Sequence, residues 1–142
     1  MRFTELDWFT TTSPAFARHG ELVMQAFHQA GHMFTPAPDG FTNQLVDLLC
    51  QHGLIDVQTR TCPLEYRYGT PAWLRLCENF QLGIQTGAPF MRKWTQLPDD
   101  YQALCQRALS EMHQSDFVAT THLLTAWGTS LRLSHERPGN QP

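Results

Sequence analysis

The stretch from Thr42 to Cys62 changes its hydrophobic period once, and the change falls at Gly53. Before the glycine, three leucines follow helical spacing, so we expect a helix from about Thr42 to His52 that ends at Gly53. After the glycine, positions alternate as in a half-buried strand; the inward set is Ile55, Val57, Thr59 and Thr61. A helix that leads directly into a strand predicts a mixed α/β domain.

Two further strands are expected near the ends of the chain. Arg2–Phe9 is rich in aromatic and β-favouring residues. Phe117–Trp127 has apolar or small residues on both faces, which predicts a strand in the interior of a sheet. The strand after Gly53 contains Pro63, whose nitrogen cannot donate a ladder hydrogen bond, so we expect that strand at a sheet edge.

Cap residues mark three more helices. Ser13-Pro14 opens a helix that is expected to end near Gly31. Thr70-Pro71 opens a second one, and two glycines weaken its end. We expect a loop after it, which carries Pro89, Phe90 and Trp94, and then a helix from about Pro98 to Met112.

Composition narrows the classes of partner. Charged residues are 16% of the 142 residues, against roughly 25% in an average soluble chain, so part of the surface is expected to face a partner. The net charge of −3 argues against nucleic acid. No apolar run reaches the about 20 residues that span a bilayer, and we expect a cytoplasmic protein without a signal peptide. Four scattered cysteines are expected to be reduced and mostly buried: Cys50, Cys62, Cys77 and Cys105.

Three phrases carry a family resemblance. RFTELDWFTTTSP, the helix-to-strand joint LVDLLCQHGLIDVQTRTCPLEY and the ending THLLTAWG together resemble the C-terminal half of a class I S-adenosylmethionine-dependent methyltransferase. The resemblance covers Arg2 to Thr129 and implies a partial Rossmann-like sheet of about three strands with four or five helices. It implies that the last strand lies, antiparallel, between the other two.

The same resemblance implies a division of the chain. Residues 1–129 would form one domain, with helical inserts over 10–40 and 66–116 that bind a small-molecule acceptor, and residues 130–142 would form a flexible tail. The sequence has no GxGxG loop, and in this family that loop holds the cofactor. We therefore expect S-adenosylmethionine through the resemblance only, and not on this chain alone.

The first strand would then lack a neighbour on one side. Its free edge would expose backbone hydrogen-bonding groups, and its apolar side chains would be partly uncovered. We expect an association through Arg2–Phe9, either with a separate N-terminal methyltransferase half or with a second copy. A truncated gene product that associates with nothing is a further alternative.

The acceptor site is expected at the carboxyl end of the first strand. There Asp7 either accepts a hydrogen bond from the acceptor or is an ordinary strand-end residue, and Trp8 would line the pocket. Insert residues that could wall an apolar acceptor are Phe34, Phe90, Met91 and Trp94, whereas Trp73 and Phe80 are interpreted as helix core. No catalytic residue is assigned; Asp7 or a histidine of the inserts is the only base that the sequence offers.

Other polar residues are given structural interpretations. His28 and His32 have a metal-chelating spacing, but Gly31 separates them, so we expect no metal. Cys50 and His52 point to different sides of a helix and are not expected to form a nucleophilic pair. Two more histidines are expected in structural places, His122 in the buried strand and His113 at a helix end beside Asp116.

Two functions remain open at this point. The first is the acceptor-binding half of a methyltransferase, inactive without a cofactor-binding half. The second is a non-catalytic binding or scaffold protein that pairs with itself or with a complete methyltransferase. A hydrolase is disfavoured because no nucleophile elbow is present in the sequence.

Overall fold

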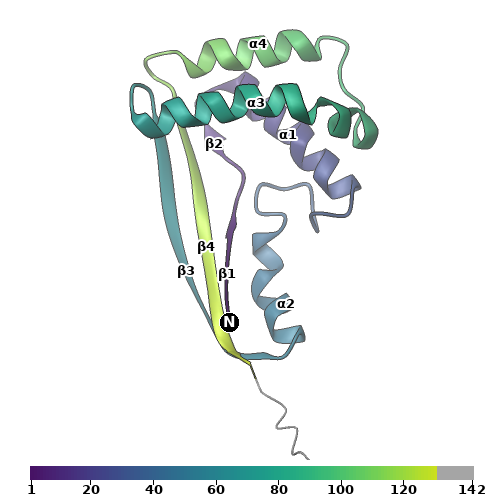
Figure 1. Ribbon diagram of the computed structural model, residues 1–142, viewed down its shortest axis with the longest axis vertical. Coiled ribbons are helices and arrows are strands. Elements are labelled where there is room, and N and C mark those ends of the chain that lie inside the picture. The colour runs from purple at the N-terminus through teal and green to yellow at the C-terminus, as the bar shows by residue number, and fades with distance from the viewer. Residues whose placement is uncertain (131–142) are drawn as a thin grey trace, which may run out of the picture.

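The computed structural model describes residues 1–130, which form a mixed α/β domain with four helices and a four-stranded antiparallel sheet (Figure 1). The strands are β1 (Arg2–Leu6), β2 (Thr10–Thr11), β3 (Leu54–Arg67) and β4 (Val118–Ser130). The helices are α1 (Pro14–Gln29), α2 (Leu45–Gln51), α3 (Pro71–Trp94) and α4 (Tyr101–Met112), with a short 3-10 turn before α2. The expected tail spans 130–142, and its residues 131–142 lie outside the described part of the chain.

β4 is the central strand of the sheet. β1 and β2 pair with it on one side and β3 on the other, and every pairing is antiparallel. β1 and β3 therefore run in the same direction (Figure 1). β3 reaches the end of the sheet, where Arg67 pairs with Val118, whereas β1 stops at Leu6, opposite Leu123 in the middle of β4. The expected position of the last strand between the other two is confirmed. So is the edge position of the strand with Pro63, since β3 pairs only with β4 in the described part of the chain.

The first strand is shorter than predicted. Asp7 still donates its N–H to the His122 carbonyl, but the N–H of Trp8 donates to the Pro38 carbonyl at 2.8 Å, away from the sheet. The Trp8 indole lies directly against Gly20 of α1. The prediction of one strand over Arg2–Phe9 is thus wrong at its end, because burial of the indole against α1 turns the backbone out of the ladder before β2 begins.

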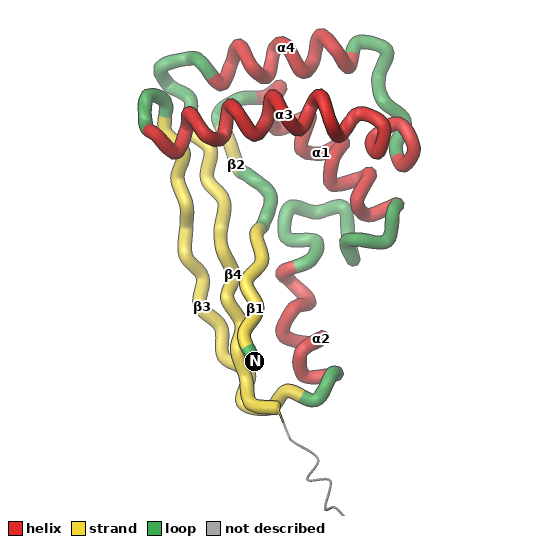
Figure 2. Tube along the Cα trace, viewed as in Figure 1, coloured by secondary structure: helices red, strands yellow, loops and turns green. Residues whose placement is uncertain are grey.

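The helices occupy two places relative to the sheet. α1, α3 and α4 lie across the end of the sheet where β3 finishes and β4 begins, and α2 lies beside the other half of the sheet (Figure 2). The larger core joins α1, α3 and α4 to the start of β4 and includes Phe16, Met112 and Ala119. The smaller core packs α2 against Leu54 and Ala126. Ala119 and Ala126 are seven positions apart in one strand, so the two cores lie on opposite faces of β4.

Both predicted caps of α1 are confirmed. The Ser13 hydroxyl accepts the N–H of Phe16 at 3.0 Å, and Pro14 occupies the first helical position, where no N–H is needed. The helix stops before Gly31, whose φ of 78° is a left-handed value that glycine adopts without strain. Glu111 of α4 adds a second acceptor at the same N-terminus, because its carboxylate takes hydrogen bonds from Ser13 Oγ at 2.6 Å and from the Ala15 N–H at 2.9 Å.

The joint between α2 and β3 lies at Gly53, as the sequence predicts. The half-buried alternation expected after it is wrong, because Ile55, Thr59 and Thr61 are exposed. Gly53 has a φ of 84°, and Leu54 after it is buried in the smaller core with Leu45 and Leu49. The helix itself is shorter than expected, since Thr42–Gln44 form a 3-10 turn and regular α-helix starts at Leu45. A helix this short is marginal alone, so packing against β3 and β4 is what holds it.

The loop expected around Pro89 does not exist, because α3 continues through it to Trp94. Proline removes one helical hydrogen bond and costs about 3 kcal/mol in a helix interior. An apolar stripe nevertheless continues at helical spacing past it, and Met91 on that stripe is buried. Burial of large apolar side chains is worth about 1.5–3 kcal/mol each, which offsets the proline. The residues of the stripe are Phe80, Ile84, Gly87, Met91 and Trp94.

Burial of β4 is less complete than predicted. The strand is paired on both sides, yet His122 is exposed, because neither helical layer covers the sheet at that position. The strand also runs on to Ser130, past its expected end at Trp127. All four cysteines are free; Cys77 and Cys105 are buried as expected, whereas Cys50 and Cys62 are exposed.

Candidate functional site

An open apolar cavity of about 820 Å³ lies between the end of the sheet and the helices α1 and α3. Its lining includes Leu6, the last residue of β1, and Tyr66, which is close to the end of β3. Aromatic side chains supply much of the wall, among them Phe16, Phe80 and Phe90. A volume in the range of 300–1,000 Å³ and an apolar wall are typical of a site for a small organic molecule.

Two polar side chains, His19 of α1 and Tyr101 of α4, meet in the lining of this cavity. The Nε2 atom of His19 lies 3.1 Å from the Tyr101 hydroxyl, and the two rings are stacked at an interplanar angle of 26°. The Phe80 ring stands edge-on to the imidazole at 4.9 Å. His19 is only 7% exposed, and its second ring nitrogen, Nδ1, is buried without a hydrogen-bond partner.

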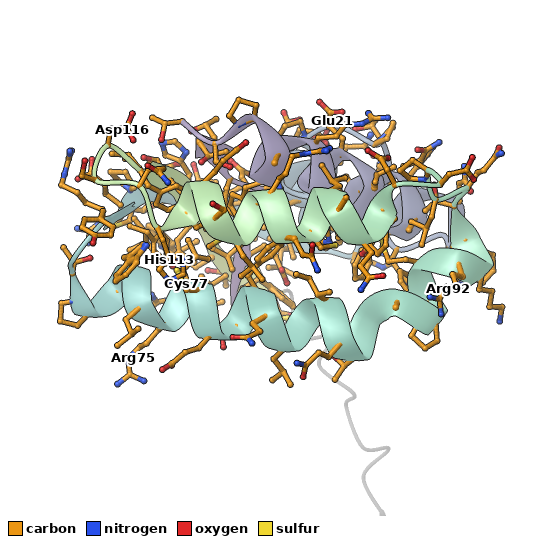
Figure 3. All side chains as sticks on the ribbon, turned by 90° about the horizontal axis from the view of Figure 1, so that it is seen from above. Glu21, Arg75, Cys77, Arg92, His113 and Asp116 are labelled. Carbon is orange, nitrogen blue, oxygen red and sulfur yellow. The ribbon has the colours of Figure 1, made fainter. Side chains whose placement is uncertain are left out.

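Burial sets the charge state of this pair. Loss of hydration lowers the pKa of His19 to about 4, so the imidazole is neutral at pH 7. Burial, with a hydrogen bond to Cys105, raises the pKa of the Tyr101 phenol above its usual value. Among the described residues that line the cavity none is acidic, and Arg75 is the one with a formal charge at pH 7. The Arg75 side chain is exposed and points away from α4 and α1 (Figure 3).

Trp8 lines the cavity, as the sequence predicts, and is held there by a glycine. A β-carbon at Gly20 would collide with the indole nitrogen, so only glycine lets the ring lie against α1. The indole N–H is itself buried without a partner. Trp8 Nε1 and His19 Nδ1 are thus both buried without a hydrogen-bond partner.

Asp7 lies outside the cavity lining. Its carboxylate accepts a hydrogen bond from the Thr42 hydroxyl, and its backbone carbonyl accepts one from Thr121 Oγ at 2.6 Å. Both contacts join the end of β1 to neighbouring segments of the chain. Of the two interpretations left open by the sequence, this geometry favours the structural one.

The other predicted wall residues are divided between the cavity and the core. Phe90 and Met91 line the cavity, but from helix α3 rather than from a loop. Trp94 packs against the larger core, and the Lys93 ammonium lies 5.0 Å from the centre of its ring. Phe34 is stacked on Phe41, outside the lining.

The sequence analysis missed His19, although a signal for it was present. His19 stands on the apolar stripe of α1 with Phe16 and Val23, at spacings of three and four residues. A histidine on such a stripe is buried, and a buried imidazole needs partners. Tyr101 is the first residue of α4, and nothing local in the sequence shows that its side chain meets His19.

Three other histidines within residues 1–130 lie at or just beyond helix ends. His28 Nδ1 lies 3.1 Å from the Met33 carbonyl, and His32 follows the end of α1. His113 is the C-cap of α4, where its Nδ1 lies 2.7 Å from the Leu109 carbonyl. Across residues 1–130 no three His, Cys, Asp or Glu side chains lie close enough together to hold a metal ion.

None of the helices in residues 1–130 combines the length and the apolar character that a membrane span requires. Comparisons of the chain with protein-family models, with curated proteins and with solved structures found no match.

Proposed function

We propose that this chain is the acceptor-binding half of a class I S-adenosylmethionine-dependent methyltransferase of Rossmann-like type, acting on an apolar small molecule. The observation that carries the proposal is the position of the cavity. Its lining includes the last residue of β1 and a residue near the end of β3, two strands of one direction that flank an antiparallel strand. In open sheets of parallel strands, ligands bind at the carboxyl ends of the strands, and the proposal extends that rule to β1 and β3.

The residues of this chain do not fit the cofactor by themselves. Binding of a nucleotide-type cofactor in such sheets uses a glycine-rich turn between a strand and a helix. The described glycines lie elsewhere: within α1, α3 and β4, or singly in turns such as Gly53 and Gly69. The cofactor half must therefore be supplied by other residues, and β1 offers a place for it.

β1 has one free edge in the described structure. The N–H of Asp7 donates to the His122 carbonyl, and the Gly128 N–H donates to the Met1 carbonyl. Because hydrogen-bonded pairs alternate in an antiparallel ladder, the N–H and C=O groups of Thr4 and Leu6 face away from β4. Such a row of unpaired groups is a template for one more strand.

The chain's own contribution to the reaction is binding and positioning. An apolar cavity removes the acceptor from water and limits its orientations, and orientation alone accounts for a large share of many enzymatic rate enhancements. Phe16, Phe80 and Phe90 form walls against which a flat or aliphatic acceptor packs.

The test is a calorimetric titration with S-adenosylhomocysteine, the product form of the cofactor. The chain alone should give no heat, and the chain mixed with the polypeptide encoded directly upstream should bind with measurable heat. The upstream polypeptide alone is the control. Heat with the chain alone, or no gain of binding from the mixture, contradicts the proposal.

One observation favours the second candidate, a self-associating binding protein. All five residues of β1 are exposed, including Phe3 at 38% and Leu6 at 54%. A second copy can cover the same edge that a cofactor half would cover.

Hydrogen exchange separates the two candidates. In the self-associating protein the Thr4 and Leu6 amides are protected without any other polypeptide. In the half-enzyme they become protected only in the mixture.

A further inference from the structure

One row of residues along α3 follows the cavity and changes from polar to apolar. Its members are four positions apart, so they lie one above the other on the same face of the helix. All five of them line the cavity: Arg75, Asn79, Gly83, Gly87 and Met91. Arg75 and Asn79 are exposed and Met91 is buried, so the row leads from the solvent towards the interior.

The two glycines in the middle of this row leave the cavity wall without side chains. A β-carbon at Gly83 or Gly87 would come within 4 Å of nothing beyond its chain neighbours and the backbone of its own helix. At about 100° per residue, both glycines fall in the arc between Asn79 and Phe80, and these two residues line the cavity themselves. A side chain at either glycine would therefore project into the cavity.

Aromatic contacts between α1 and α3 bound the glycines on both sides along the helix. The rings of Phe16 and Phe80 lie 5.0 Å apart, centre to centre. The rings of Phe27 and Phe90 lie 4.9 Å apart, and Phe27 is still 40% exposed. Between these contacts α1 contributes Val23 to the lining. At 1.5 Å per residue the two contacts are about 15 Å apart along α3, so the lining extends along the helix.

We propose that the cavity binds an extended aliphatic acid, with its chain over Gly83 and Gly87 and its carboxylate at Arg75. From Gly83 to Met91 the row is about 12 Å long at 1.5 Å per residue, which is the length of an extended chain of about ten carbons. This deepens the proposed function by naming a class of acceptor, and it rests on that function only for the statement that the ligand is the acceptor.

The charge of the lining fits an acidic head group and a neutral chain. Arg75 carries the one formal charge in the described lining, and it takes part in none of the ion pairs within residues 1–130. Its side chain is exposed (Figure 3), so a carboxylate beside it stays hydrated and avoids the cost of burying a charge. Asn79, one turn further along, carries an amide group that donates hydrogen bonds.

Three acids with the same head group test the shape of the ligand: decanoate, hexanoate and 1-adamantanecarboxylate, each titrated calorimetrically into the unmodified chain at pH 7.5. Each buried methylene strengthens binding about 4-fold, so burial of two of the four extra methylenes makes decanoate bind at least about 10-fold more tightly than hexanoate. The adamantane acid has a ten-carbon cage that cannot extend, and it should bind more weakly than decanoate. A decanoate affinity equal to that of either other acid would overturn the extended chain, and this comparison needs no variant.

Leucines placed in the row test where the chain lies. Gly83→Leu and Gly87→Leu each fill part of the space and should weaken decanoate binding at least about 10-fold, because they displace two or more methylenes. Both variants should fold, since leucine favours a helix more than glycine does, and a thermal melt checks this. Gln85→Leu is the matched control: it adds the same side chain at an exposed site on the opposite side of α3, outside the lining, and should bind as the unmodified chain does. Unchanged decanoate affinity in both glycine variants contradicts the proposal.

A charge variant tests the position of the head group. In Arg75→Gln the ratio of decanoate affinity to 1-decanol affinity should fall about 2–5-fold, which is the size of an exposed ion pair. Arg92→Gln removes an exposed arginine of α3 that lies outside the lining, and it should leave the ratio unchanged. An unchanged ratio in Arg75→Gln would contradict the placement of the carboxylate.

The outcomes separate this inference from the proposed function. Decanoate binding that depends on the two glycines, together with no S-adenosylhomocysteine binding in the mixture, keeps the extended acid and removes the methyltransferase. S-adenosylhomocysteine binding in the mixture, without a preference for decanoate over hexanoate, keeps the methyltransferase and removes the extended acid.

Discussion

At the residue scale, the buried histidine sets a pH dependence. The pKa of His19 is about 4 in the folded protein and about 6.5 in an unfolded chain, so between these values only the unfolded state takes up the proton. The contribution of His19 to stability is therefore fully present above pH 6.5 and declines as the pH falls towards 4. The lowered pKa corresponds to about 3 kcal/mol.

We predict the difference in free energy of unfolding between the unmodified chain and a variant, because carboxylates also titrate in this pH range. The free energy of unfolding of the unmodified chain, relative to that of His19→Gln, should fall by about 3 kcal/mol between pH 7 and pH 4. Urea denaturation at a series of pH values measures it. His122→Gln serves as the control, and its curve should run parallel to that of the unmodified chain. A parallel curve for His19→Gln would show that the imidazole is not buried in neutral form.

A second residue-scale prediction concerns the two helical glycines Gly20 and Gly83. Gly20→Ala gains helix propensity but forces the Trp8 indole to move, so we expect a net loss of about 1–3 kcal/mol. Gly83→Ala places its methyl group in open space and should gain up to about 1 kcal/mol. Denaturation curves of both variants measure the contrast, and a stabilised Gly20→Ala would contradict the packing of Trp8.

Residues of the site were only partly predictable. Trp8 could be placed at the cavity because it lies at the end of a strand pattern in the sequence, which is a local signal. Asp7 has the same local position, yet its carboxylate is bound by Thr42, 35 residues away in the sequence. The His19–Tyr101 contact spans 82 residues. Pairings of this kind depend on how helices pack, and a single sequence does not encode that packing in any local pattern.

At the element scale, the position of α1 depends on Glu111 from another helix. Its carboxylate binds two donors at the α1 N-terminus, where a negative charge is favourable. Glu111→Ala leaves both donors without this acceptor and should cost about 2 kcal/mol in urea denaturation. The control is Glu21→Ala, which breaks an exposed pair with Arg18 and should change stability by less than about 0.5 kcal/mol. Equal effects would deny Glu111 this role.

Elements with strong local signals were predictable, and those decided by burial were not. The caps at Ser13 and Gly53 fix where α1 begins and α2 ends, and both are in the structure as expected. Pro89 gives an equally strong local signal for a loop, but the buried stripe that includes Met91 overrides it. The period of the stripe, rather than the proline, was the better guide.

At the scale of the whole molecule, the order of the three long strand patterns could be predicted because an edge and an interior strand have different compositions. Pro63 marks the edge and the apolar Phe117–Trp127 marks the interior. The fourth, two-residue strand β2 is too short to leave a pattern. Of the parts of this fold, the exposed strand β1 is the one that most needs a partner to cover it.

The most direct measurement of that need is sedimentation of the chain alone at about 10 μM, together with its thermal melt. Full burial of an apolar side chain is worth about 1.5–3 kcal/mol, and Phe3 and Leu6, at 38% and 54% exposure, each forgo a part of it. If β1 is built to receive another strand, the chain will sediment above its monomer mass of 16.3 kDa or will melt without a cooperative transition. A single species of 16.3 kDa that melts cooperatively would show that β1 needs no neighbour, and the half-enzyme would lose its structural basis.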